Sequence, residues 1–429
     1  MQKRTAIFHR IHAKLGDFWW YSLMLFCACR AADALNAFIG LWLVPSRVSP
    51  AELGAVQPLT QFSTLLALPV SVFALVFARE VAVLASKKEF GRLKSLLRGV
   101  FWATGVFLVV ALGVSRLFLP VFLRQIRIAE GSLGLVILAS AFLGAAAPVY
   151  TNALQGLKRF KELSLVNLVG APLRLAVLLV AMPFRALSGY FLAQCAAPAF
   201  QIFASVFGLR RELRHPAEPY WTRPALKRFS RLLLVVGALY AAASAAGFIE
   251  QFIIRQRLPD VESAAYYMTS RFADIASFFS CTLGVTLFPF TAESAAQGRA
   301  TKPLVLKAAG ATLAVSALLA LVFAFAGAPI LRLLPHGDLY APYAPVIPGL
   351  VALAFLNAVL GFHINTEIAA GRFAFLKWYI PANLLYAAAL YLWPQGTPLS
   401  ADSLPAILGW LLAGAAIRFA FTVRDLVRQ

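Results

Sequence analysis

Long apolar stretches alternate with short polar stretches along almost the whole chain. A transmembrane helix needs about 20 consecutive apolar residues, and runs of that kind recur twelve times, bounded by charged residues, proline or glycine. We therefore predict an all-α polytopic membrane protein with about twelve transmembrane helices. The predicted spans cover residues 18–44, 51–78, 100–122, 131–154, 163–182, 187–209, 232–254, 261–290, 308–330, 343–368, 378–393 and 404–421.

Lysine and arginine are divided unequally between the loops on the two sides of this predicted bundle. One side carries 27 of them and the other side carries 8. Cytoplasmic loops of membrane proteins are enriched in these two residues. The cation-rich side, which also holds both chain ends, is therefore predicted to be cytoplasmic, and two cytoplasmic ends require an even number of spans.

A basic, proline-containing segment near the midpoint divides the predicted spans into two sets of six. We predict a cytoplasmic amphipathic segment at 1–17, an N-lobe at 18–209, a cytoplasmic linker at 210–231, a C-lobe at 232–421 and a cytoplasmic tail at 422–429. Because six is even, both lobes have the same orientation, which predicts a parallel pseudo-two-fold repeat about the membrane normal. Matched residues in the two halves agree with this: Glu52 and Phe62 with Glu262 and Phe272, and Arg159-Phe160 with Arg372-Phe373.

Composition narrows the classes of function. Apolar residues make up 61% of the chain, and the mean hydropathy is +0.77. The net charge of +21 fits basic cytoplasmic loops, and no basic stretch has the interleaved aromatic residues of a nucleic-acid-binding surface. The four cysteines lie in apolar runs and the five histidines are scattered, so we expect neither a disulfide nor a metal site. We expect no cofactor.

Charged residues inside the predicted spans are the candidates for function, because a charge in the bilayer core costs at least about 2.5–3.5 kcal/mol. Arg30 precedes Asp33 by three residues, and Arg271 precedes Asp274 by three residues. That spacing allows each pair to form a salt bridge on one helix face, so each pair is either structural or part of a cavity. Arg174 has no acid within four residues on its own helix, which favours a role in binding.

Two further acids lie within predicted spans. Glu250 follows Phe248-Ile249, and Glu367 ends the sequence His363-Ile-Asn-Thr-Glu. Either carboxylate suits a coupling ion, H⁺ or Na⁺, and either equally suits a hydrogen-bonded partner for a membrane arginine. Soluble-enzyme motifs such as a Walker A loop or a G-x-S-x-G elbow are missing from the sequence, and the predicted exterior loops are short. We therefore expect no enzymatic activity, and a membrane glycan polymerase or ligase is the weaker alternative.

Several segments resemble a known transporter family. The stretch Asn152-Ala-Leu-Gln-Gly-Leu-Lys-Arg-Phe-Lys161, the segments from Asn167 and Val44, and residues 264–289 are similar to the polysaccharide transporter (oligosaccharide flippase) family. This family belongs to the multidrug/oligosaccharidyl-lipid/polysaccharide (MOP) exporter superfamily. The resemblance implies a V-shaped pair of lobes around a central cavity, alternating access, and a polyprenyl-diphosphate-linked oligosaccharide as the cargo. Twelve spans favour it over the lipid II flippases, which usually have fourteen.

Residues and resemblance together predict a monomeric flippase for a cell-surface polysaccharide or lipopolysaccharide precursor in the bacterial plasma membrane. Arginine suits a diphosphate because its planar guanidinium binds two phosphate oxygens at once. The alternative within the superfamily is an ion-coupled multidrug exporter. The predicted substrate-binding residues are Arg30, Arg174 and Arg271, and the predicted ion-coupling or charge-partner residues are Asp33, Glu250, Asp274 and Glu367.

Overall fold

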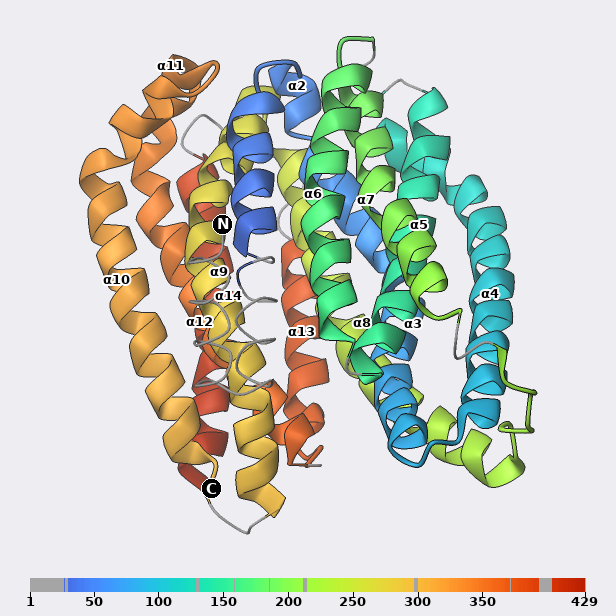
Figure 1. Ribbon diagram of the computed structural model, residues 1–429. Coiled ribbons are helices and arrows are strands. Elements are labelled where there is room, and N and C mark those ends of the chain that lie inside the picture. The colour runs from blue at the N-terminus through green and yellow to red at the C-terminus, as the bar shows by residue number, and fades with distance from the viewer. Residues whose placement is uncertain are drawn as a thin grey trace, which may run out of the picture. The chain divides into compact units, whose positions relative to one another are not determined.

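A computed structural model describes most of the chain, and every regular element within the described ranges is helical (Figure 1). The described residues are 27, 30–128, 131–157, 159–184, 186–210, 214–296, 300–370, 372–392 and 403–428. The predicted amphipathic segment at 1–17 and most of the first half of the first predicted span lie outside these ranges. The first span is described as helix over residues 30–38, which continues as the π-helical turn η1 (Ile39–Leu43).

Eleven further long helices follow in the order that the apolar runs predict. They are α3 (Val56–Ser86), α4 (Phe90–Gln125), α5 (Gly131–Gly156), α6 (Phe160–Ala181), α7 (Ala186–Gly208), α8 (Arg223–Arg257), α9 (Asp260–Ala296), α10 (Lys302–Leu333), α12 (Ile347–Ala369), α13 (Leu376–Tyr391) and α14 (Ser403–Arg428). Short helices α2 (Pro50–Leu53), α11 (Gly337–Tyr340) and η3 (Ala341–Val346) fill two of the connections.

Seven segments of the described helices are long and apolar enough to cross a membrane by length and composition. They are Leu133–Leu154, Lys161–Ala181, Ala186–Gly208, Leu233–Arg257, Lys302–Leu333, Gly337–Ile368 and Leu404–Val427. With 16 residues, α13 is shorter than an average crossing. Helices α4, α8, α10 and α14 extend beyond their apolar runs into basic sequence, so the polar flanks continue the helices instead of ending them.

The chain divides into two compact units. The first contains Met1–Ile39, Ser63–Leu123 and Ala129–Tyr240, and the second contains Gly40–Phe62, Arg124–Ile128 and Ala241–Gln429. The loops before α3 and after α4 thus belong to the second unit, although most of α3 and α4 belongs to the first.

In the first unit, α7 packs along both α5 and α6 (Figure 1). A second part of its core lies between α3, α4 and α5, where the fully buried side chains include Phe77, Leu93, Leu97 and Val149. The segment that follows α7 closes over one end of this core, because the Glu218 amide donates to the Gly91 carbonyl at 3.1 Å and Tyr220 packs against the cluster.

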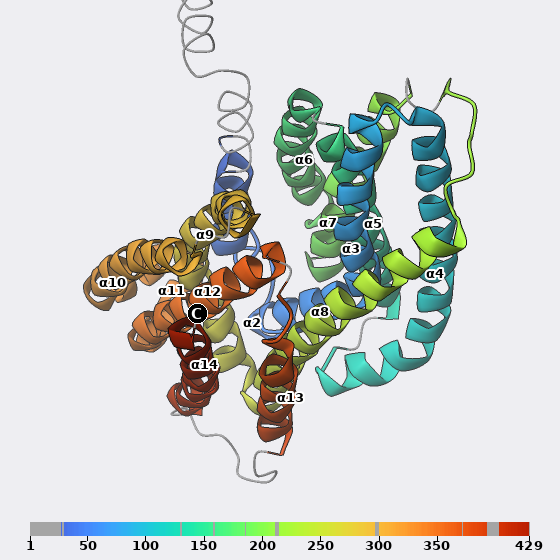
Figure 2. The ribbon, with the colours of Figure 1, turned by 90° about the horizontal axis from the view of Figure 1, so that it is seen from below.

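In the second unit, α12 is the central helix and contacts α9, α10 and α14 (Figure 2). At one end of these four helices, Leu287, Val305, Phe362 and Leu426 form a buried apolar cluster. The short helix α2 packs on α9. Its start follows from the local sequence, because Ser49 and Glu52 form a capping box around Pro50, a residue suited to the first helical position.

Prolines interrupt the backbone hydrogen bonding of several long helices within the described ranges. Pro120, Pro148, Pro172, Pro198, Pro329 and Pro381 lie inside α4, α5, α6, α7, α10 and α13 respectively. The predicted in-span residue Pro345 lies instead in η3, ahead of α12. Each internal proline removes one amide donor and frees a carbonyl that a neighbouring group must satisfy.

Candidate functional site

Arg174 of α6 lies among polar side chains of the first unit. Its Nη1 donates to the Asn36 side-chain oxygen at 2.7 Å, and its guanidinium carbon lies 5.7 Å from the centre of the Tyr190 ring of α7. The Tyr190 hydroxyl in turn accepts a hydrogen bond from Gln194 at 2.8 Å. Among the described residues, the buried Nε of Arg174 has no hydrogen-bond partner. The recorded neighbours of this cation are thus an amide and an aromatic ring, and neither neutralises its charge.

Arg30 and Asp33 form the salt bridge that their spacing predicts, with 2.8 Å between Nη2 and Oδ2. Asn36 lies three residues further along the same helix, so Asp33 and Asn36 share one side of it. The structure therefore brings Arg174 to the helix that carries the Arg30–Asp33 pair, through Asn36.

Arg271 and Asp274 of α9 form the equivalent pair in the second unit, with 2.9 Å between Nη1 and Oδ2. The Arg271 guanidinium lies 4.8 Å from the centre of the Tyr267 ring, and the Tyr267 hydroxyl donates to the Gly40 carbonyl at 3.3 Å. Each unit thus contains an arginine–aspartate pair within one helix.

Glu250 of α8 lies in a polar cluster of the second unit that includes two tyrosines. The Tyr386 hydroxyl of α13 donates to Glu250 Oε2 at 2.8 Å. Gln251 donates from Nε2 to Glu250 Oε1 at 3.4 Å and to the Tyr266 hydroxyl of α9 at 3.3 Å. Glu250 and Arg257 also line a small cavity whose other walls are Ile253, Ile254, Leu390, Ile407 and Trp410. The Glu250 carboxylate therefore accepts hydrogen bonds from Tyr386 and Gln251 and also lies in the wall of a mostly apolar cavity.

Arg418 belongs to this cluster, which sequence reasoning missed. The cation count assigned Arg418 to the cytoplasmic side, whereas the structure buries it within α14. Its Nη1 donates to the Asn383 side-chain oxygen of α13 at 3.1 Å, and its guanidinium lies 4.6 Å from the centre of the Tyr386 ring. Its neighbours on α13 distinguish it from an arginine that extends toward water. The sequence of the span that contains Arg418 does not show that these neighbours are present.

Glu367 of α12 pairs with Arg372 in the following loop, with 2.6 Å between Oε1 and Nη2. Arg372 also donates to the Thr301 hydroxyl at 3.2 Å. Glu367 therefore has a charge partner, the second of the two roles that the sequence allows. Its partner belongs to a loop and to none of the predicted spans.

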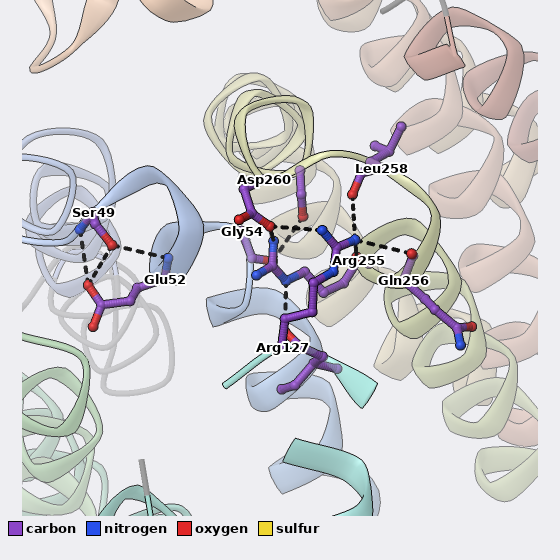
Figure 3. Close-up of polar contacts among 10 residues, drawn as sticks. Ser49, Glu52, Gly54, Arg127, Arg255, Gln256, Leu258 and Asp260 are labelled. Carbon is purple, nitrogen blue, oxygen red and sulfur yellow. Dashed lines mark hydrogen bonds and ion pairs between the residues drawn. The ribbon is translucent and has the colours of Figure 1, made fainter. Parts of the chain in front are cut away.

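A node of two arginines and one aspartate lies at the corner between α8 and α9 (Figure 3). Asp260 Oδ1 accepts from Arg255 at 2.8 Å and from Arg127 at 3.1 Å. Arg127, which has a left-handed backbone with φ of 61°, also donates to the carbonyls of Arg255, Gln256 and Leu258 at 2.9–3.1 Å. Arg255 donates from Nε to the Ile126 carbonyl at 3.1 Å. We call these three charged residues the corner node.

Gly54, at the end of α2, lies beside the corner node. A Cβ atom at this position would lie 2.6 Å from the Ser263 hydroxyl and 3.1 Å from Arg255 Nη1, so glycine permits the close approach of α2 to α9. No group of three or more His, Cys, Asp or Glu residues that suits a metal ion occurs in the described part of the chain.

Comparisons with known proteins find similarity in the fold. No protein-family model and no curated protein matches the sequence. Among solved structures, an inward-facing multidrug resistance MATE family transporter of the MOP superfamily has a TM-score of 0.70 at 14% identity, covering 92% of this chain and 95% of its own. The lipid II flippase MurJ in an inward closed conformation has a TM-score of 0.66 at 12% identity, covering 95% of this chain and 87% of its own.

The chain is also similar to a MOP superfamily transporter from Pyrococcus furiosus. That protein is described as having a binding pocket of reverse polarity, which suggests a different function. Its TM-score is 0.62 at 14% identity, covering 97% of this chain and 98% of its own. The predicted class, an all-α polytopic membrane protein, is thereby confirmed, and about twelve helices fit this fold. The chain has the fold of MOP superfamily transporters and flippases.

Proposed function

We propose that the chain is a flippase that moves a polyprenyl-diphosphate-linked oligosaccharide across a bacterial plasma membrane by alternating access. The observation that carries this proposal is the environment of Arg174, whose guanidinium is held by the neutral Asn36 amide at 2.7 Å. A cation with no recorded carboxylate partner within the described residues is available to an anionic cargo. In a low-dielectric site, such a charge attracts a diphosphate strongly.

Similar proteins support the cargo class and the mechanism. One solved neighbour is a flippase for lipid II, and the Pyrococcus furiosus transporter is described by the reversed polarity of its pocket. Solved MATE family neighbours are described in inward-facing and outward-facing conformations. In the proposed mechanism, Arg174 binds the diphosphate in the first unit, and Arg30 of the same unit joins it when Asp33 releases that arginine. Arg271 of the second unit is proposed to bind cargo in its own unit when Asp274 releases it.

The coupling step is assigned to carboxylates in this proposal. Glu250, held by the Tyr386 hydroxyl at 2.8 Å, is the proposed binding group for a proton or Na⁺. Asp33 and Asp274 are proposed to regulate the neighbouring arginines by pairing with them. Glu367, bound to Arg372, is a charge partner. Both chain ends are proposed to be cytoplasmic, from the 27 to 8 distribution of Lys and Arg.

The test of this function is transport of a fluorescent polyprenyl-diphosphate oligosaccharide in proteoliposomes, with chemical quenching of the outer leaflet as the readout. Arg174→Ala should abolish translocation, and Arg174→Lys should restore only part of it, because an ammonium cannot bind two phosphate oxygens in the same fork geometry. Arg210→Ala is the matched control, since Arg210 is exposed at the end of α7 and lies over Phe207.

A cargo with the same glycan on a monophosphate separates charge recognition from glycan recognition. The wild-type protein should move the diphosphate faster, and Arg174→Ala should lose that preference. Wild-type rates with Arg174→Ala would remove Arg174 from the site.

A second candidate function is an ion-coupled multidrug exporter. The half-buried carboxylate of Glu250 favours it, because a carboxylate attracts a cationic substrate. Ethidium efflux from the same proteoliposomes distinguishes the two: efflux that depends on Glu250 without glycolipid flipping would support the exporter.

A further inference from the structure

His363 is a completely buried imidazole near the end of α12, with 0% of its side chain exposed. Within the described residues, neither ring nitrogen has a hydrogen-bond partner. Buried polar atoms are satisfied in the large majority of cases, and a structural histidine usually uses at least one nitrogen. This residue is therefore unusual for a buried histidine.

A carboxylate lies just beyond hydrogen-bonding distance of this imidazole. Asp425 of α14 has its Oδ2 atom 3.8 Å from His363 Nε2. The same oxygen accepts a hydrogen bond from the indole N–H of Trp378 in α13. The Asp425 side chain is 21% exposed, so its carboxylate connects the buried ring to the solvent-accessible surface.

Aromatic rings enclose the imidazole on its other sides. The Trp378 ring stacks near it, with centroids 6.5 Å apart and planes inclined by 21°. The Phe375 ring meets it edge-on at 6.2 Å. These apolar rings do not solvate a charge, so a protonated imidazole at this position needs a carboxylate partner.

The other charged groups around His363 already have partners. Glu367, one turn further along α12, is bound to Arg372 at 2.6 Å, and Arg372 also donates to Thr301 beside α10. Arg424 of α14 approaches Asp425 at 4.0 Å. Glu367, Asp425 and Arg372 act electrostatically on the imidazole. Asp425 is therefore the carboxylate that can pair with a protonated His363 ring.

We propose that His363 and Asp425 form a proton-binding site that links α12 to α14. A proton from water enters at Asp425 and moves to His363 Nε2, and the resulting N–H donates to the Asp425 carboxylate. Closing the gap from 3.8 Å to an ion-pair distance of about 2.8 Å moves the two helices together by up to about 1 Å. Loss of the proton releases them.

This inference rests on the proposed transport function in one respect, because it names the proton as the coupling ion. Proton binding itself is independent of the cargo. The experiment therefore measures binding first and transport second, so that failure of either is recognised separately.

Binding is measured on the full-length protein in lipid nanodiscs with isotope-labelled histidine rings. The chain has five histidines, and the signal lost in His363→Gln identifies the buried one. Its ring nitrogens should titrate reversibly within the range in which histidine changes charge, about pH 5 to 8. In Asp425→Asn the midpoint should move to lower pH, because the charged ring loses its carboxylate partner.

His215→Gln is the matched control, since His215 is exposed and stacks on Phe90 in the first unit; it should leave the His363 titration unchanged. Intrinsic tryptophan fluorescence, to which Trp378 contributes as one of eight tryptophans, gives a second readout that needs no labelling. Its pH-dependent quenching should disappear in His363→Gln. A His363 ring that stays in one protonation state over this range, or an Asp425→Asn midpoint equal to that of wild type, would overturn the site.

Transport is then measured in the proteoliposome assay with and without a pH gradient. The gradient should accelerate cargo movement several-fold in the wild-type protein. In His363→Gln, this acceleration should fall several-fold, because Glu250 is then the remaining proposed proton-binding group. Acceleration equal to that of the wild type would overturn the coupling role, whereas a complete lack of glycolipid movement by the wild-type protein would refute the proposed function and leave the titration intact.

Discussion

Replacing Asp260 by asparagine removes the carboxylate that two arginines of the corner node share. Arg255 is 1% exposed, Arg127 is 44% exposed and Asp260 is 40% exposed. Among the described residues, Arg255 Nη2 has no hydrogen-bond partner. The buried guanidinium therefore depends on Asp260 for its countercharge, while Arg127 is also held by three backbone carbonyls.

The expected magnitude follows from these exposures. The exposed pair of Arg127 and Asp260 is worth about 0.2–1 kcal/mol. Removing the partner of a fully buried charge costs about 3–5 kcal/mol. Because water reaches the half-exposed Asp260 carboxylate, the loss should lie below that range, and we expect Asp260→Asn to lower the free energy of unfolding by about 2 kcal/mol.

Thermal unfolding of the purified protein in detergent tests this expectation. Asp338→Asn is the matched control, because Asp338 is also an exposed acid in the first turn of a helix, α11. A double-mutant cycle with Arg255→Met isolates the coupling between the two side chains. If Asp260→Asn melts with the wild type, or if Arg255→Met costs the same with and without Asp260, the ion pair does not stabilise this corner.

Two further predictions concern the candidate sites. Gly414→Ala should lower stability by about 1–3 kcal/mol and should slow transport, because the added methyl group would collide with the Tyr386 ring that binds Glu250. The control in both assays is Gly409→Ala on the same helix, where a Cβ meets nothing within 4 Å. The double change Arg30→Met with Asp33→Leu should fold as the wild type does, because it removes both members of a salt bridge. It should also slow glycolipid flipping, and full activity would restrict this pair to a structural role.

The sequence predicts the helices well because bilayer thickness dictates the length of an apolar run. The run at residues 131–154 became α5 (Gly131–Gly156), and the run at 187–209 became α7 (Ala186–Gly208). It predicts less well how far α4 and α8 continue, since basic residues beyond the membrane also favour helix. The short helix α2 begins at the capping box of Ser49 and Glu52, and a hydropathy pattern does not show such a cap.

Charge pairs within one helix were predictable, and charge pairs between elements were not. The three-residue spacing of Arg30 and Asp33 and of Arg271 and Asp274 was sufficient, because a helix places such residues on one face. The environment of Arg174 depends instead on Asn36, which is 138 residues away in the chain.

Arg418 illustrates why the remaining site residues could not be found from one sequence. A cation near the end of a predicted span can extend to water or bind inward, and both outcomes have the same local sequence. The inward position of Arg418 is determined by the Asn383 amide and by the Tyr386 ring, and Gly414 lets that ring approach α14. These partners lie on α13 and α14, whose hydropathy gives no indication that they meet at this level. The same holds for His363, which seemed isolated in the sequence because its carboxylate is 62 residues later, at Asp425. The packing of the helices determines which polar groups within the spans form pairs. The proposed chemistry of this chain depends on those pairs.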